Sequence, residues 1–241
     1  MIIAADYTRH FQELNEAIRA TADRKVEIRP CMGQRYIASG LSGKEIVIHG
    51  TPGNALGAYL DGSRIEVYGN VQDAVGDTMN DGEIIVHGSA GDAVGYGMRG
   101  GCILVEKNAG YRAGIHMKAY QDKIPSLIIG GCAGSFLGEY LAGGVIIVLG
   151  LTSEGAPIVG NFCGTGMHGG KIILRCETLP DDLPAQVSAH RASESDLTEI
   201  RPYLERYEAA FSVDLNLLMK EPFWILTPNA KNPYHQLYTQ Q

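Results

Sequence analysis

One copy of a repeated unit occupies residues 91–106 and reads Gly91-Asp92-Ala93-Val94-Gly95-Tyr96-Gly97-Met98-Arg99-Gly100-Gly101-Cys102-Ile103-Leu104-Val105-Glu106. The unit contains two glycines four residues apart, a Leu or Met three residues later, a further glycine and a five-residue β-prone segment. Its second glycine returns every nineteen residues and then, after insertions of five and seven residues, twice more, giving Gly57, Gly76, Gly95, Gly114, Gly138 and Gly164. Such self-similarity is typical of proteins built from stacked units.

The β-prone segments align into columns of branched aliphatic residues. They are Glu45–His49, Arg64–Tyr68, Glu83–His87, Cys102–Glu106, Ser126–Gly130, Val145–Leu149 and Lys171–Arg175. Their second and fourth positions are Ile, Leu or Val in every copy. This alternation indicates strands with one buried face, which stack about 4.8 Å apart. It predicts an all-β core, a right-handed parallel β-helix that is a single-stranded solenoid of about seven coils, with flanking N- and C-terminal α-helices.

The repeated glycines are interpreted as structural. A glycine adopts positive φ and lets neighbouring backbones approach closely, as a tight corner in every coil requires. A phosphate-binding loop occurs once, after a strand and at the start of a helix. Here the glycines recur in each unit and no Gly-Lys-Ser or Gly-Lys-Thr sequence is present.

Three regions are expected: residues 1–32 with a helix over Thr8–Arg24, the repeat at 33–176, and a C-terminal extension at 177–241. In the extension, Ser195–Phe211 has a helical pattern with a break or a new start at Pro202. A shorter helix is expected from Asp214 to Lys220, and the apolar tail Pro222–Pro228 is expected to pack on the repeat or on a partner. The insertions at 119–125 and 153–157 are expected to be loops on one face.

Composition excludes several classes of protein. The net charge is −7 and basic residues form no run, which argues against nucleic acid as a partner. No apolar stretch approaches the roughly 20 residues that span a bilayer, so we expect no membrane association and a cytoplasmic location. The cysteines are scattered, without a C-x-x-C pair, and are expected to be reduced and to bind no metal. Cys163 is expected to be buried, and Cys102 more accessible.

The third position of the strand segments is aliphatic although it faces outward. The residues concerned are Val47, Ile85, Leu104, Ile128, Ile147 and Ile173. Either the chain's own C-terminal helices cover this column or another chain docks on it, and the two alternatives stay open.

The sequences Gly33–Ala38, Gly138–Gly150 and Gly164–Gly170, together with the repeated glycines, resemble the GXGXG domain of the glutamate synthase large subunit. The resemblance covers about Gly33–Cys176. It implies a free-standing, non-catalytic scaffold and docking subunit of a glutamate synthase-type complex in glutamate biosynthesis. The implied partners are a glutamine amidotransferase subunit and an FMN-containing synthase subunit, with FMN and an iron–sulfur cluster on the partners.

No catalytic, cofactor-binding or metal-binding residue is expected on this chain itself. The amidotransferase's N-terminal nucleophilic cysteine has no counterpart beside Met1, and the cysteine cluster for iron–sulfur is absent. His49 and His87 fall two coils apart, about 10 Å, and are interpreted as surface residues. One corner is a weaker candidate for a surface facing a partner's active site or an ammonia path, with the residues His116, Glu139, Tyr140 and His168.

Two alternatives remain beside the glutamate synthase assignment. The C subunit of formylmethanofuran dehydrogenase has a similar repeat and is also non-catalytic. The other alternative is an independent protein that self-associates through its aliphatic outer column into a homo-oligomer. A polysaccharide lyase or hydrolase would need paired carboxylates on one face, but Asp61, Asp73 and Asp92 fall at turns.

Overall fold

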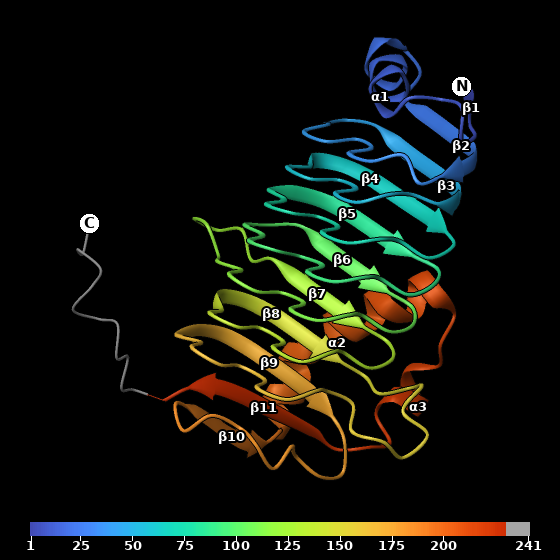
Figure 1. Ribbon diagram of the computed structural model, residues 1–241. Coiled ribbons are helices and arrows are strands. Elements are labelled where there is room, and N and C mark those ends of the chain that lie inside the picture. Colours follow the sequence, from blue (N-terminus) through green and yellow to red (C-terminus); the bar gives the residue numbers. More distant parts are fainter. Residues whose placement is uncertain (230–241) are drawn as a thin grey trace, which may run out of the picture.

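The computed structural model describes residues 1–229, in which all strands belong to one eleven-stranded sheet (Figure 1). Strands β1 to β9 follow one another in chain order and pair in parallel, and β11 and β10 complete the sheet in antiparallel pairing. The strands are β1 (Ile2–Ala5), β2 (Lys25–Met32), β3 (Glu45–Thr51), β4 (Asp61–Tyr68), β5 (Asp81–Val86), β6 (Cys102–Val105), β7 (Ser126–Ile129), β8 (Ala142–Val148), β9 (Gly169–Arg175), β10 (Val187–Arg191) and β11 (Phe223–Pro228). The helices are α1 (Phe11–Ala20), α2 (Glu194–Phe211) and α3 (Leu215–Leu218).

The register of the parallel strands confirms the predicted columns. Ile46 of β3 pairs with Ile65 of β4, and the same column continues through Ile84, Ile103 and the later strands to β9. These side chains are fully buried and form the main core, together with Leu and Met residues from the chain between the strands. One strand per repeat therefore generates one continuous aliphatic face.

The predicted fold class, a parallel β-helix solenoid of about seven coils, is corrected by this topology. The molecule is a single open, mixed sheet. The chain between the strands contributes only isolated bridges, such as Val71 with Ala90 and Ala90 with Ala109, and builds no further sheet. The sheet also begins at Ile2, before the repeat, and ends in an antiparallel pair after it. The period of the sequence determines which strands are neighbours, but it does not determine what the connections between them form.

The helices are few, and one expectation about them was wrong. Helix α1 lies within the predicted range, and its N-cap is His10, whose ring accepts a hydrogen bond from the Gln12 amide. Helix α2 continues through Pro202 without the predicted break. The proline removes one backbone donor, but packing of the helix on the sheet through Ile200 and Leu204 outweighs that loss.

The C-terminal tail forms strand β11 on the chain's own sheet. Trp224 pairs with Leu174 of β9 on one side and with Arg191 of β10 on the other. The two insertions do not share one face as expected. The first precedes the start of β7, whereas the second follows the end of β8, so they lie at opposite ends of the parallel strands.

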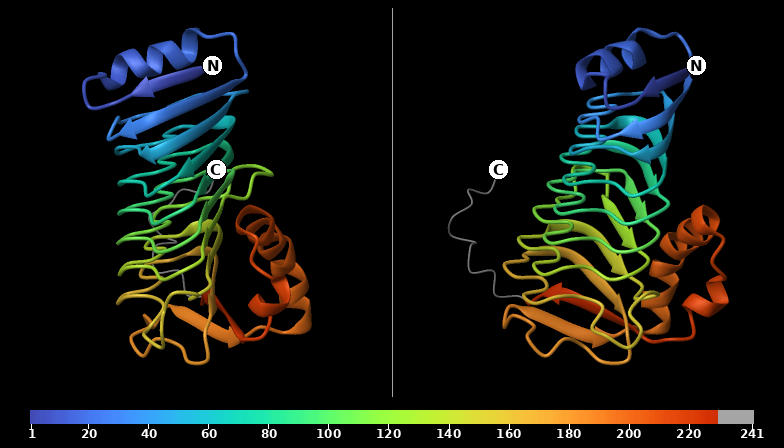
Figure 2. Two further views of the ribbon diagram at one scale, coloured as in Figure 1. Left: turned by 90° about the vertical axis from the view of Figure 1, so that its right-hand side faces the viewer. Right: turned by 45° about the vertical axis from the view of Figure 1, so that its right-hand side comes forward.

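Helix α2 covers the outer face of the sheet over the later strands, from β5 onward (Figure 2). Five of the six residues of the outward aliphatic column are buried in the cluster beneath it: Ile85, Leu104, Ile128, Ile147 and Ile173. Val47 lies outside this cluster and is half-buried. This column is therefore covered by the chain's own C-terminal region.

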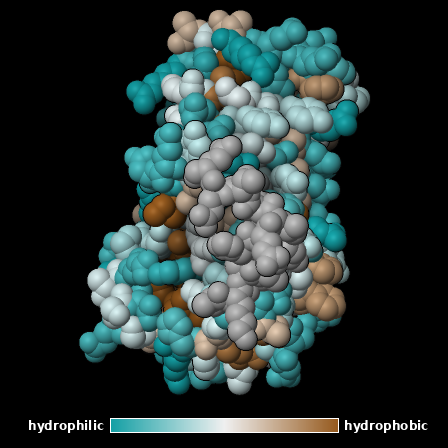
Figure 3. Space-filling view, turned by 90° about the vertical axis from the view of Figure 1, so that its left-hand side faces the viewer, coloured by the Kyte–Doolittle hydropathy of each residue, from teal (hydrophilic) through white to brown (hydrophobic). Residues whose placement is uncertain are grey.

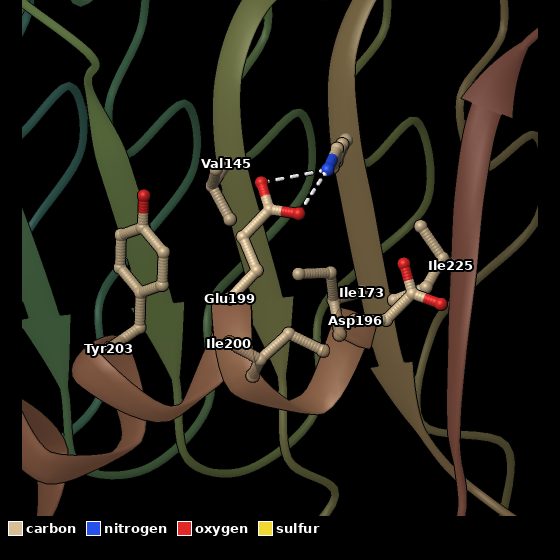
Figure 4. Close-up of a pocket in the computed structure, with 8 residues that line it drawn as sticks. Val145, Ile173, Asp196, Glu199, Ile200, Tyr203 and Ile225 are labelled. Atoms are coloured by element: carbon tan, nitrogen blue, oxygen red, sulfur yellow. Dashed lines mark hydrogen bonds and ion pairs between the residues drawn. The ribbon is translucent and has the colours of Figure 1, made fainter. Parts of the chain in front are cut away.

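Further side-chain contacts hold α2 against the sheet. Figure 4 shows Ile200 against Ile173 and the Glu199 carboxylate reaching to the Lys171 ammonium, 2.7 Å away. Cys102 was expected to be accessible, but it is only 1% exposed in the cluster under α2, and burial raises the pKa of its thiol. Among residues 1–229, no helix combines the length and the apolar composition needed to cross a bilayer.

The packing of α2 predicts that Leu204→Ala lowers the free energy of unfolding by about 2–5 kcal/mol, because Leu204 is fully buried between helix and sheet. Chemical denaturation measures this change. The control is Glu205→Ala, an exposed position on the same helix, where we expect almost no effect. Equal stabilities of the two variants would contradict the described packing.

Candidate functional site

Seven five-residue turns lie side by side at the edge of the molecule where the strands begin. Each turn precedes a strand of the repeat, from β3 to β9. They occupy residues 36–40, 55–59, 74–78, 93–97, 112–116, 136–140 and 162–166. In every turn the first, third and fifth residues have φ between +52° and +73°. We call this surface the turn edge; Figure 3 views the molecule from this side and shows hydrophobic patches among mainly hydrophilic side chains.

Hydrogen bonds between neighbouring turns hold this alternating left-handed conformation. In the second turn, the Tyr59 amide donates forward to the Asp77 carbonyl of the third turn at 2.7 Å, and the Ala55 amide donates to the carbonyl of Asp73, just before that turn, at 2.9 Å. The amide of Gly57, between them, donates backward to the Ile37 carbonyl at 2.8 Å. The same pattern repeats along the edge, so each turn between the first and the last is bonded to the turns on both sides. The ladder compensates for the strain of left-handed non-glycine residues.

The third position of each turn faces the core, and this explains the repeated glycines. It is glycine in the last six turns, at Gly57, Gly76, Gly95, Gly114, Gly138 and Gly164, and alanine in the first. A Cβ atom on Gly138 would lie 2.6 Å from Cδ1 of Ile172, a residue of the inner aliphatic column. The glycine therefore provides both the positive φ and the space for the core.

Side chains cap the ladder at its two ends. In the first turn the Ala38 amide has no preceding turn to bond to, and it donates to Oδ1 of Asn15 from α1 at 3.1 Å. Asn15 is only 6% exposed, and its Nδ2 donates to the carbonyl of Arg35, the residue just before this turn. In the last turn the forward-pointing Phe162 amide donates to the Asp182 carboxylate at 3.0 Å.

A row of aromatic side chains crosses three turns of this edge. The His116 ring stacks on Tyr140 with centroids 5.3 Å apart and an interplanar angle of 8°, and Tyr96 meets His116 edge-on at 5.8 Å. Tyr96 and Tyr140 are 39% and 37% exposed. Tyr140 also lies close against Gly166 of the next turn, where a Cβ atom would be 2.6 Å from its ring.

A second row lies on the first positions of the last three turns. The Arg112 guanidinium is 4.9 Å from the Phe136 ring centroid, and Phe136 stacks on Phe162 at 5.0 Å. Phe162 is 49% exposed although it is large and apolar. We call the two rows together the aromatic edge, formed by Tyr96, Arg112, His116, Phe136, Tyr140 and Phe162.

The structure brings together three of the four residues predicted at the weak corner. His116 and Tyr140 stack, and Glu139 lies beside them with its carboxylate 3.5 Å from Nε of Arg112. His168 lies just past the last turn, where its Nδ1 is 3.2 Å from the Gly166 carbonyl oxygen.

The other members of the aromatic edge, Tyr96, Arg112, Phe136 and Phe162, were not predicted from the sequence. Tyr96 is the fourth residue of its turn, and the other three are the first residues of theirs. Aligning the first residues of the turns in the sequence repeat would therefore have shown the row of Arg112, Phe136 and Phe162.

The first insertion adds to the same edge. Lys123 reaches back to Asp81, its ammonium 3.1 Å from the carboxylate, and this contact lowers the pKa of Asp81 and raises that of Lys123. The insertion thereby exposes Tyr120 and Ile124, which are 55% and 58% accessible. The edge is thus rigid, rich in aromatic side chains and partly apolar.

This composition favours binding to another protein. Tyr, Phe and Arg dominate the energetics of protein interfaces, and a prefixed aromatic surface loses little conformational freedom on binding. Among residues 1–229, no group of three or more His, Cys, Asp or Glu side chains is arranged to hold a metal ion.

The outer face of β2 to β5, beyond the cluster under α2, carries a charged network. Tyr68 stacks between His49 and His87, and His87 also meets Phe211 at the end of α2. Glu66 accepts hydrogen bonds from Arg64 at 2.7 Å and Tyr68 at 3.0 Å, and its carboxylate is 3.0 Å from Nε2 of His87.

These contacts decide the ionisation of Glu66. Burial by itself raises the pKa of Glu66, but the hydrogen bonds from His87 and Arg64 outweigh it and hold the pKa below its ordinary value. His49 and His87 thus lie on this outer face, as expected, where both stack on Tyr68.

The Asn15 cap predicts that Asn15→Ala lowers the free energy of unfolding by about 1–3 kcal/mol, because the buried Ala38 amide loses its acceptor. Thermal or urea unfolding measures the loss. Glu16→Ala, at the neighbouring exposed position of α1, is the control and should leave stability nearly unchanged. If both variants are as stable as the parent chain, the cap does not hold the first turn.

The lowered pKa of Glu66 predicts a pH-dependent stability difference between the parent chain and Glu66→Gln. A carboxyl group whose folded pKa is depressed stabilises the fold above its ordinary value of 4.5. That contribution disappears as the pH falls through the folded pKa. Melting temperatures between neutral pH and pH of about 3 should therefore converge at the acid end. A difference that stays constant with pH would contradict the network.

Comparison with known proteins agrees with the geometry of the turns. The model of the GXGXG motif family matches residues 11–226. A protein of Methanocaldococcus jannaschii named "Uncharacterized protein MJ1350" is 43% identical over 243 residues, covering 95% of this chain and 93% of the relative. Glycines at alternating positions are what three alternating left-handed residues per turn favour, as in Gly95-Tyr96-Gly97 and Gly164-Thr165-Gly166. The chain therefore belongs to the GXGXG motif family.

Proposed function

We propose that this protein is a non-catalytic docking subunit of a glutamate synthase-type oxidoreductase complex. The observation that carries the proposal is the aromatic edge, an exposed group of aromatic rings with an arginine on a hydrogen-bonded ladder. The motif family and the resemblance of the repeat to the glutamate synthase large subunit support the same assignment.

The expected partners are a glutamine amidotransferase subunit and an FMN-containing synthase subunit, which would also carry the iron–sulfur cluster. This chain would contribute the rigid surface against which they are positioned. The aliphatic outer column does not provide that surface here, because α2 already buries most of it. The turn edge replaces it as the proposed contact, since Phe162 and Tyr140 remain accessible.

The first experiment is purification of the tagged protein from its native host at low salt, with identification of the proteins that accompany it. Flavin absorbance and glutamine-dependent glutamate formation by the complex would support the proposal. Recovery of a molybdenum- or tungsten-pterin enzyme instead would assign the chain to a formylmethanofuran dehydrogenase-type complex. A homo-oligomer without other subunits would contradict both assignments.

In this complex, Phe162→Ala and Tyr140→Ala should each weaken subunit association about tenfold or more, because central aromatic side chains dominate interface energies. Co-purification from the native host and titration of the purified subunits measure the effect. Tyr7→Ala is the control, since Tyr7 is 83% exposed and lies outside the turn edge. Unchanged association of both edge variants, with unfolding temperatures like that of the parent chain, would show that partners bind elsewhere.

A further inference from the structure

A second surface of the molecule is a groove lined mainly by cationic side chains. A groove of about 450 Å³ lies on the outer side of the sheet where β3, β4 and β5 begin, next to α2. Its charged lining residues are Arg24, Lys44, Arg64 and Arg206, against Glu45 and Glu83. The lining thus has more cationic than anionic side chains, although the chain as a whole has a net charge of −7.

Two of the four cations are held in place by the protein itself. Arg64 bonds to Glu66 at 2.7 Å and to Glu83 at 3.1 Å. The Lys44 ammonium donates to the backbone carbonyls of Thr21 and Asp23. These contacts fix the middle of the groove and neutralise part of its charge.

The other two cations are available. Within the described chain, neither Arg24 nor Arg206 forms an ion pair with a carboxylate, and both side chains are exposed. An exposed guanidinium pair on the two sides of one groove is a ready recognition element for carboxylates.

The spacing of these two residues indicates an elongated ligand. Arg24 directly precedes β2, and Arg206 of α2 lies beside Cys102 of β6. Four strand spacings separate β2 from β6, so the backbones of these two strands are about 19 Å apart. An extended peptide of about six residues has this length, whereas a single small anion is much shorter.

The groove favours an acidic peptide over a nucleic acid. No aromatic side chain lines it, so bases would find no stacking surface. Glu45 and Glu83 would repel phosphates and acidic side chains alike, but their oxygens are suitable acceptors for the backbone amides of a peptide, which a sugar–phosphate backbone lacks. The floor is also open, because Gly43 and Gly62 have no atoms within 4 Å of the position of a Cβ atom.

We propose that this groove binds an extended segment of a partner protein rich in Asp or Glu, lying across the starts of β3 to β5 between Arg24 and Arg206. The inference rests on the proposed function in one respect, that the chain works as a docking subunit. It uses a surface distinct from the aromatic edge and can therefore be tested separately.

The test is a titration of the full chain against a fluorescein-labelled hexaglutamate peptide, followed by fluorescence anisotropy at low ionic strength. Arg24→Ala and Arg206→Ala should each weaken binding by about two- to fivefold, as expected for exposed charge pairs. Added salt should weaken it further. Arg201→Ala is the matched control, an exposed arginine on α2 outside the groove, and should bind like the parent chain. Arg206→Lys should retain most of the binding, with unfolding temperatures checked for all variants.

Four outcomes would overturn the inference. They are no binding of the peptide at low ionic strength, an equal loss in Arg201→Ala, full competition by inorganic pyrophosphate at the peptide's own concentration, and tighter binding of a hexathymidylate of matched charge. Subunit association through the aromatic edge is measured independently with Phe162→Ala. Failure of the peptide titration alone would therefore reject the groove and leave the proposed function in place.

Discussion

The structure depends on one backbone arrangement, the alternation of left-handed residues in each turn. That conformation is costly for residues such as Tyr59 or Phe136, and it persists because every turn exchanges hydrogen bonds with its neighbours. The direction of these bonds keeps the strands one repeat apart and in register. It also requires glycine where the turn meets the inner aliphatic column, as at Gly138. The parallel stacking of β3 to β9, the core behind these strands and the exposed aromatic rows all follow from the turns.

Helix α2 divides the outer face of the sheet into a covered and an uncovered region. Where the outward column is aliphatic, α2 covers it and completes a second core around Leu204 and Tyr207. Where the column is charged, around Glu66, the face remains uncovered and holds an ion-pair network and the groove beside Arg206. The end of α2 at Phe211, against His87, marks the boundary between the two.

The repeat and the columns could be predicted from the sequence because stacked strands convert a period into spatial neighbours. The overall architecture could not, since nothing in the period specifies that the connections form isolated bridges, or that Phe223–Pro228 joins the same sheet in antiparallel pairing. Pro202 misled the helix prediction because tertiary packing outweighed a local rule. At the turn edge, His116 and Tyr140 were recognised as polar residues, whereas Arg112 and Phe162 belong to a column visible only after the turns are superimposed.

The two caps have a consequence for the length of the molecule. Asn15 satisfies the backward-pointing amide of whichever turn comes first, and Asp182 the forward-pointing amide of whichever comes last. Neither contact depends on how many turns lie between them. The length of the molecule is therefore set by the number of repeats between two fixed ends, and each repeat adds one strand spacing of about 4.8 Å. Gain or loss of a whole repeat would change the distance between surfaces on the two halves of the sheet in steps of that size, without altering either end.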